Sequence, residues 1–139
     1  MNGTLIALII AVIVVGVLIF VAITLTQNRK HSFNREEYQA EWLTINNSLK
    51  KDSPDSYNMV IVKADKFLDR ALVEMGVPGK TIGERLKKLH GRLSEEDDVW
   101  SAHKSRNRIA HETNYNATYY EAKRSLAAFK SALKDIGAI

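Results

Sequence analysis

The chain has 139 residues, with 20 Lys and Arg against 16 Asp and Glu, and it contains no Cys. Without Cys it can form no disulfide, thiolate metal centre or cysteine nucleophile, which excludes zinc fingers, iron–sulfur proteins and thiol enzymes. The length leaves room for one modest domain. Residues 1–28 carry no charged side chain, so every charge falls in the rest of the chain.

The uncharged beginning predicts a membrane anchor. Residues 5–25 read LIALIIAVIVVGVLIFVAITL and are interrupted only by Gly16 and Thr24. At about 1.5 Å per residue, a helix of this length spans the hydrocarbon core of a bilayer, roughly 30 Å. A cleaved signal peptide would need a basic start, a shorter apolar run and a small-residue cleavage site, and this segment has none of the three. We therefore expect residues 1–28 to form an uncleaved transmembrane helix whose residues 5–25 contact the lipid bilayer.

The charges that follow this segment predict its orientation. Arg29, Lys30 and His31 come directly after it, whereas residues 1–4 contain no Lys or Arg. Positive residues flanking a membrane span favour the cytoplasmic side. We expect a single-pass protein with its N-terminus outside, a basic juxtamembrane linker over residues 29–35, and a cytoplasmic domain over residues 36–139.

The rest of the chain predicts an all-α fold. Apolar residues recur at spacings of three and four, the period of one helix face, and we expect them to form the core. The stripes are Tyr38, Trp42, Ile45 and Leu49; Tyr57, Ile61, Ala64, Leu68, Ala71 and Met75; Ile82, Leu86, Leu89 and Leu93; and Tyr119, Ala122, Leu126, Phe129, Leu133 and Ile136. The short connections between them favour a bundle of four to five antiparallel helices.

Helix-capping residues mark several of the predicted ends. Thr81 with Glu84 fits a capping box, and Ser94 before an acidic first turn fits the cap of the next helix. Gly137 lies where a C-cap glycine is expected after the last helix.

One polar segment before the last helix is a candidate for chemistry. It reads SRNRIAHE over residues 105–112. An RNA phosphodiester can be cut by its own 2′-hydroxyl when a base removes the proton and a cation stabilises the charge on phosphorus. A histidine can act as the acid or base, the role we assign to His111, and Arg106 can bind phosphate oxygens through its planar fork. Asn107 can orient the imidazole or the phosphate. We expect no metal and no cofactor.

The same residues resemble a known family, the HEPN domains. These are helical bundles whose nuclease members carry an Arg, usually a polar residue after it, and a His four to six residues after the Arg. Arg106, Asn107 and His111 match this pattern in the expected place, before the final helix, and TIGERL over residues 81–86 is similar to many bacterial members. The resemblance covers roughly residues 36–136. It implies a metal-independent endoribonuclease whose active site forms across a two-fold homodimer.

Helix geometry limits how these residues can converge. Five positions on an ideal helix turn through about 500°, so Arg106 and His111 would point some 140° apart, whereas Asn107 and His111 share a face. Either the helix ends near Ile109, or two copies of the chain build a composite site.

Other interpretations of this segment remain open. Its cations and Asn107 can simply serve as a helix C-terminal cap. Many HEPN-like domains are thought to be non-catalytic, which leaves an interaction module that binds RNA or a protein partner at the membrane, and an unrelated bundle is a third possibility.

The basic and aromatic side chains of the last third offer candidate RNA contacts. We select Lys104 and Arg108 as RNA-binding residues. A wider phosphate-binding surface would also include Lys123, Arg124, Lys130 and Lys134, although such residues are usually solvated. Tyr115, Tyr119 and Tyr120 can stack on bases, but the position of Tyr119 in its stripe favours the core.

Overall fold

The computed structural model of the chain describes residues 2–27 and 32–139. In these residues the regular secondary structure consists of six helices, with no strand. The chain divides into two compact units, one ending at Ser32 and the other spanning Phe33–Ile139. The prediction of an all-α fold is confirmed.

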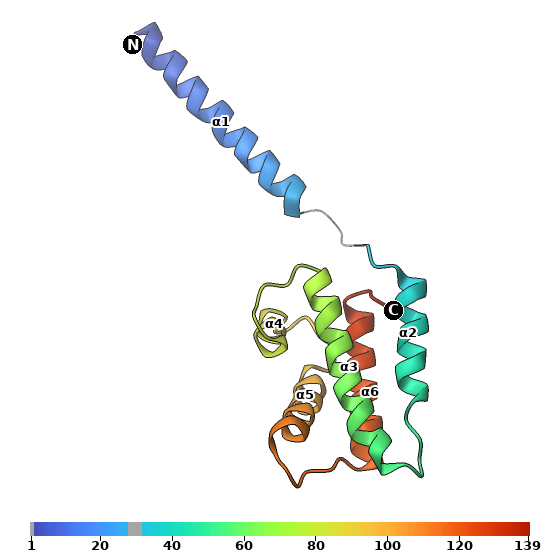
Figure 1. The fold of residues 1–139 in the computed structure, drawn as a ribbon. Coiled ribbons are helices and arrows are strands. Elements are labelled where there is room, and N and C mark those ends of the chain that lie inside the picture. Colours follow the sequence, from blue (N-terminus) through green and yellow to red (C-terminus); the bar gives the residue numbers. More distant parts are fainter. Residues whose placement is uncertain (1, 28–31) are drawn as a thin grey trace. The chain divides into compact units, whose positions relative to one another are not determined.

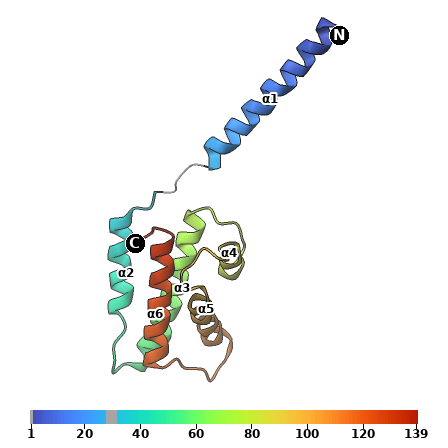
Figure 2. The same ribbon diagram turned by 180° about the vertical axis from the view of Figure 1, so that it is seen from behind.

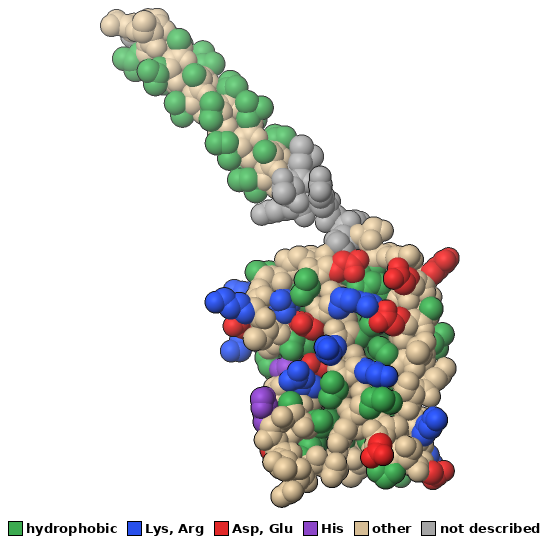
Figure 3. Space-filling view, in the orientation of Figure 1, with side chains coloured by type: hydrophobic (Ala, Val, Ile, Leu, Met, Phe, Trp, Pro, Cys, Tyr) green, Lys and Arg blue, Asp and Glu red, His purple; other side chains and the backbone are tan. Residues whose placement is uncertain are grey.

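The first unit is a single apolar helix. Helix α1 (Gly3–Gln27) contains a stretch, Gly3–Ile23, that is long and apolar enough to cross a membrane. Figure 3 shows apolar side chains along the face of this helix that it presents, and the described side chains from residue 2 to residue 23 are all exposed. A bilayer would cover such a surface, because isolated apolar helices are unfavourable in water. The predicted basic residues Arg29, Lys30 and His31 lie outside the described residues.

The second unit is a bundle of five helices. They are α2 (Arg35–Asn47), α3 (Pro54–Glu74), α4 (Ile82–Lys88), α5 (Glu96–His111) and α6 (Tyr119–Asp135). Figures 1 and 2 show α6 and α3 at the centre, with α2 on one side and α5 on the other. Helix α2 runs antiparallel to α3, as the hydrogen bond from Tyr38 at its start to Glu74 at the end of α3 requires.

The predicted apolar stripes form the core of this bundle. Phe129 and Leu133 of α6 and Ile61 and Leu68 of α3 are fully buried, and most other stripe residues are buried or packed against them. Helix α3 contacts each of the other four helices. Because it is surrounded, any polar side chain on its inner faces must find its partners inside the protein.

Two predicted helix ends agree with the structure at the level of single hydrogen bonds. Gly137 follows α6 with a positive φ of 76°, and its N–H donates to the Lys134 carbonyl, as in a Schellman turn. Thr81 caps α4 by accepting the Glu84 N–H. In a complete capping box the Glu84 carboxylate would also accept the Thr81 N–H. Here it accepts the Lys80 N–H instead, which differs from the prediction.

The segment between α4 and α5 differs from its prediction. Helix α4 ends at Lys88, so Leu93 is buried beyond the helix and not as part of it. Gly91 interrupts the helical period with a φ of 73°. Ser94 is not the cap of α5, because the N-cap is Glu95, and the Ser94 N–H and hydroxyl donate to Asp135 at the end of α6.

Candidate functional site

Helix α5 carries the three predicted catalytic residues. Its first turn is acidic, with Glu96, Asp97 and Asp98, which suits the positive end of the helix dipole. Val99, Ala102 and His103 are buried, and Arg106 follows at the same spacing, so these positions face the interior of the bundle, where α5 packs against α3 and α6. This inner face of α5 begins apolar and becomes polar toward its end.

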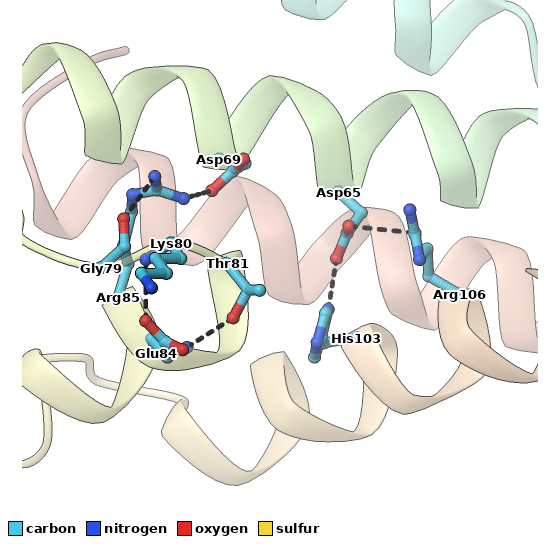
Figure 4. A network of polar contacts seen from close by, with 9 residues as sticks. All are labelled: Asp65, Asp69, Gly79, Lys80, Thr81, Glu84, Arg85, His103 and Arg106. Carbon is cyan, nitrogen blue, oxygen red and sulfur yellow. Dashed lines mark hydrogen bonds and ion pairs between the residues drawn. The ribbon is translucent and has the colours of Figure 1, made fainter.

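Asp65 of α3 binds two side chains of this inner face (Figure 4). Its Oδ1 lies 2.8 Å from His103 Nδ1, and its Oδ2 lies 3.4 Å from Arg106 Nε. Asp65 is 2 % exposed and His103 is 8 % exposed. A carboxylate so deeply buried requires charged or hydrogen-bonding partners, and these two supply them.

Asn107 closes the network on the side away from Asp65. Its amide nitrogen lies 3.2 Å from His103 Nε2, and its amide oxygen accepts a hydrogen bond of 3.1 Å from Arg106 Nη1. An amide nitrogen can only donate, so His103 Nε2 accepts, and Nδ1 carries the hydrogen that is donated to Asp65. The four side chains therefore form one closed set of polar contacts with a defined imidazole tautomer.

Arg106 has one side fixed inside the protein and one side open. Its Nε is buried and has no hydrogen-bond partner among the described residues, although it lies within ion-pair distance of Asp65. About a third of the side chain, 32 %, is exposed. A guanidinium held in this way can still offer donors to an incoming anion.

His111 lies apart from this network. It is the last residue of α5, its side chain is exposed, and the imidazole has no hydrogen bond or ion pair with any described residue. Helix α5 continues through Ile109 and ends two residues later, at His111, so His111 keeps its helical position. The structure brings Arg106 and Asn107 together through their hydrogen bond, and His111 lies some 140° from Arg106 around the helix.

The two predicted RNA-binding residues differ in availability. Arg108 lies 3.3 Å from Glu112, and its guanidinium covers the Tyr115 ring at 3.9 Å. The Tyr115 hydroxyl donates to Glu121, and burial followed by this hydrogen bond raises the pKa of Tyr115. Lys104 is exposed and has no partner among the residues described, so it is free to bind an anion.

Sequence reasoning missed Asp65 and His103. Asp65 is separated from His103 by 38 positions, so no local motif joins them. A signal was nevertheless present, because position 65 falls among the apolar positions 61, 64 and 68 of the stripe, where an unpaired carboxylate would be costly. His103 and Arg106 likewise share a face with Val99 and Ala102 at helical spacing.

Gly83 at the start of α4 lies against this cluster. A Cβ added there would be 3.6 Å from His103 Nε2, an ordinary van der Waals distance. No group of three or more His, Cys, Asp or Glu within residues 2–27 and 32–139 could hold a metal ion. The side chains that meet at this place are a carboxylate, an arginine, an amide and one histidine, His103.

Comparison with known proteins adds no relative. No protein-family model matches the chain, and neither curated proteins nor solved structures contain a significant match. The interpretation of the site therefore depends on its own geometry.

Proposed function

We propose that this chain is a membrane-anchored, HEPN-like endoribonuclease that cleaves RNA without a metal and acts as a homodimer. The observation that carries the proposal is that His111 is exposed and unbonded while Arg106, on the same helix, is held by the buried Asp65. A catalytic acid or base must reach solvent and substrate, whereas a phosphate-binding arginine benefits from being held in place.

The reaction that these groups support is attack by the 2′-hydroxyl on the adjacent phosphorus. His111 of one copy removes the 2′-hydroxyl proton, and the 2′-oxygen bonds to phosphorus as the bond to the 5′-oxygen breaks. The protonated His111 of the second copy gives its proton to the leaving 5′-oxygen. The products are a 2′,3′-cyclic phosphate and a 5′-hydroxyl. Arg106 stabilises the charge on the phosphate oxygens, and Asn107 orients Arg106 through their hydrogen bond.

Two copies are needed because one helix cannot bring the groups together. Arg106 and His111 point some 140° apart on the unbroken α5, so a phosphate bound at one Arg106 would meet a His111 from another chain. A two-fold axis places equivalent residues of both copies at one interface, and a single anchor per chain permits a parallel pair.

The proposal includes an orientation in the membrane. Arg29 and Lys30 follow the apolar segment directly, and no Lys or Arg precedes it within residues 1–4. Such a distribution favours a cytoplasmic location for residues 36–139, the compartment in which RNA is abundant.

The test is RNA cleavage by the full chain in neutral detergent with a chelator present. We expect cleavage to 2′,3′-cyclic phosphate ends, and His111→Ala to lower the rate by about 10²–10⁴-fold, the contribution of a general acid or base. His90→Gln is the matched control, because it removes another exposed histidine. Cleavage that survives in His111→Ala would overturn the assignment, and a strict monomer with full activity would overturn the composite site.

A second candidate is a non-catalytic interaction module. The observation in its favour is that Arg106 and Asn107 bond to each other and contact the buried pair of Asp65 and His103. A purely structural cluster makes the same contacts. This candidate predicts that no preparation cleaves RNA and that Arg106→Ala weakens capture of an RNA or protein partner.

A further inference from the structure

A groove between α2 and α6 lies outside the cluster around Arg106. It has a volume of about 630 Å³, within the range of ligand sites. Figure 2 shows α6 and α2 next to each other on the side of the bundle that it presents. The lining residues are Asn46, Asn47, Leu49, Tyr119, Lys123, Leu126, Ala127 and Lys130.

The polar side chains of this groove are free to bind a ligand. Lys123 and Lys130 are exposed and have no ion pair with any described residue. The side-chain amides of Asn46 and Asn47 and the hydroxyl of Tyr119 also lack hydrogen-bond partners in the described part of the chain. No lining residue is acidic, so the groove combines two positive charges with several donors and no competing carboxylate.

Three other hollows of the bundle each include an acidic side chain. The hollow between α2 and α3 includes Glu41, which holds Arg70 at 2.5 Å. Two further hollows are both lined by Asp98. Asp98 also binds Arg124 at 2.6 Å, which leaves that cation paired although it is next to Lys123 in the sequence.

The arrangement of the free groups suits a strand of nucleotides. Lys123 and Lys130 are seven residues apart, so they lie on one face of α6, about two turns or ~10 Å apart. Leu126 forms a buried apolar floor between them at 3 % exposure. The partly buried Tyr119 lies at one end, where its ring contacts Tyr57 edge-on at 5.9 Å and is thereby held in place. Lysines along a groove with an aromatic ring are the usual means of binding single-stranded RNA.

We propose that the groove between α2 and α6 binds a single-stranded segment of RNA outside the reacting centre. Lys123 and Lys130 contact phosphates, Tyr119 stacks on a base, and the amides of Asn46 and Asn47 bond to base edges. A flat lipid surface would reach the two lysines but not the floor or the ring, so the groove favours RNA over a membrane. This inference rests on the proposed function only in taking RNA as the ligand.

The test measures binding by the full chain in neutral detergent. The probe is a fluorescein-labelled, single-stranded RNA of mixed sequence with 2′-O-methyl groups, which cannot be cleaved by the proposed reaction. We expect Lys123→Ala with Lys130→Ala to weaken binding about tenfold and to reduce the slope of log K against log salt by about 1.4, the share of two phosphate contacts on a single strand. Fluorescence anisotropy gives both quantities.

The matched control is Lys87→Ala with Lys88→Ala, which removes the same charge from the exposed side chains of α4. An equal loss of RNA affinity in both double variants, or no loss in either, would overturn the proposal that the groove binds RNA. Both variants replace lysine with a stronger helix former, so α6 is expected to stay folded, and tryptophan fluorescence checks this.

Two further measurements distinguish failure of the groove proposal from failure of the nuclease assignment. If the Lys123 and Lys130 variant loses binding to the soluble lipid headgroup glycerophosphoserine but not to RNA, the groove contacts lipid and the proposal is wrong. If His111→Ala leaves RNA cleavage intact while binding still depends on the groove, the nuclease assignment fails and the groove stands. If cleavage depends on His111 but RNA binding is unchanged in the Lys123 and Lys130 variant, the groove proposal fails and the nuclease assignment stands.

Discussion

The inner face and the outer end of α5 hold their polar side chains in opposite ways. On the inner face, His103 and Arg106 contact the buried Asp65, and each is bonded to Asn107. At the outer end, the His111 side chain is exposed and makes no hydrogen bond or ion pair with any described residue. A motif that is continuous in the sequence is therefore divided between a fixed part and a free part, so its residues cannot share one structural role.

Removing Asp65 should have the largest effect on stability. Asp65→Ala leaves His103 without its hydrogen-bond acceptor and Arg106 without its ion-pair partner. Breaking a buried ion pair costs about 3 kcal/mol. We expect the free energy of unfolding to fall by that amount. The measurement is urea unfolding followed by tryptophan fluorescence, because both tryptophans, Trp42 and Trp100, belong to the bundle.

The control for this change is an exposed ion pair of the same bundle. Glu41→Ala removes the partner of Arg70, and both side chains are more than 40 % exposed. Such a pair contributes about 0.5 kcal/mol. If the two substitutions destabilise the bundle equally, the inner face of α5 is no more tightly held than the surface.

The sequence was most informative where the structure depends on near neighbours. Helix α6 has its apolar stripe and its glycine C-cap where they were predicted, because both depend on residues within a few positions of one another. Helix α4 was predicted too long for a related reason. Leu89 and Leu93 keep a helical period and are buried, but Gly91 between them turns the backbone away from the helix.

The candidate site was harder to predict because its partners come from distant helices. Arg106, Asn107 and His111 are visible as a local pattern, whereas the contact of Asp65 with His103 joins positions 38 residues apart. Periodicity predicts which face of a helix is buried but not which neighbouring helix covers it. The buried acid on α3 indicated that a partner must exist, and only the packing of α3 against α5 identifies it.

Substitutions at the outer end of α5 should leave the fold almost unchanged. His111→Ala removes an exposed side chain that bonds to no described residue, so we expect the free energy of unfolding to change by no more than about 0.5 kcal/mol. The same urea titration measures it. A loss as large as that of Asp65→Ala would mean that His111 is structural, which would contradict both the comparison and its role in cleavage.

The smallest expected effect concerns His90, a histidine that is exposed but has a partner. Its Nδ1 lies 2.8 Å from Glu96 Oε1, and the Gly91 N–H donates to Oε2 of the same carboxylate. The hydrogen bond to Glu96 raises the pKa of His90, while the Gly91 N–H first and His90 second lower the pKa of Glu96.

The signs of these two shifts define a pH window for the pair. The contribution of His90 is complete below about pH 6.5, the value for a free histidine, and is lost as the pH rises through its raised pKa. The contribution of Glu96 is complete above about pH 4.3 and is lost as the pH falls through its lowered pKa. We expect NMR titration to give a raised midpoint for His90 that Glu96→Gln returns to the ordinary value, whereas Glu95→Gln leaves it raised. If Glu96→Gln has no effect, the carboxylate does not hold the imidazole, and His90 is then as free as His111 despite its position beside α5.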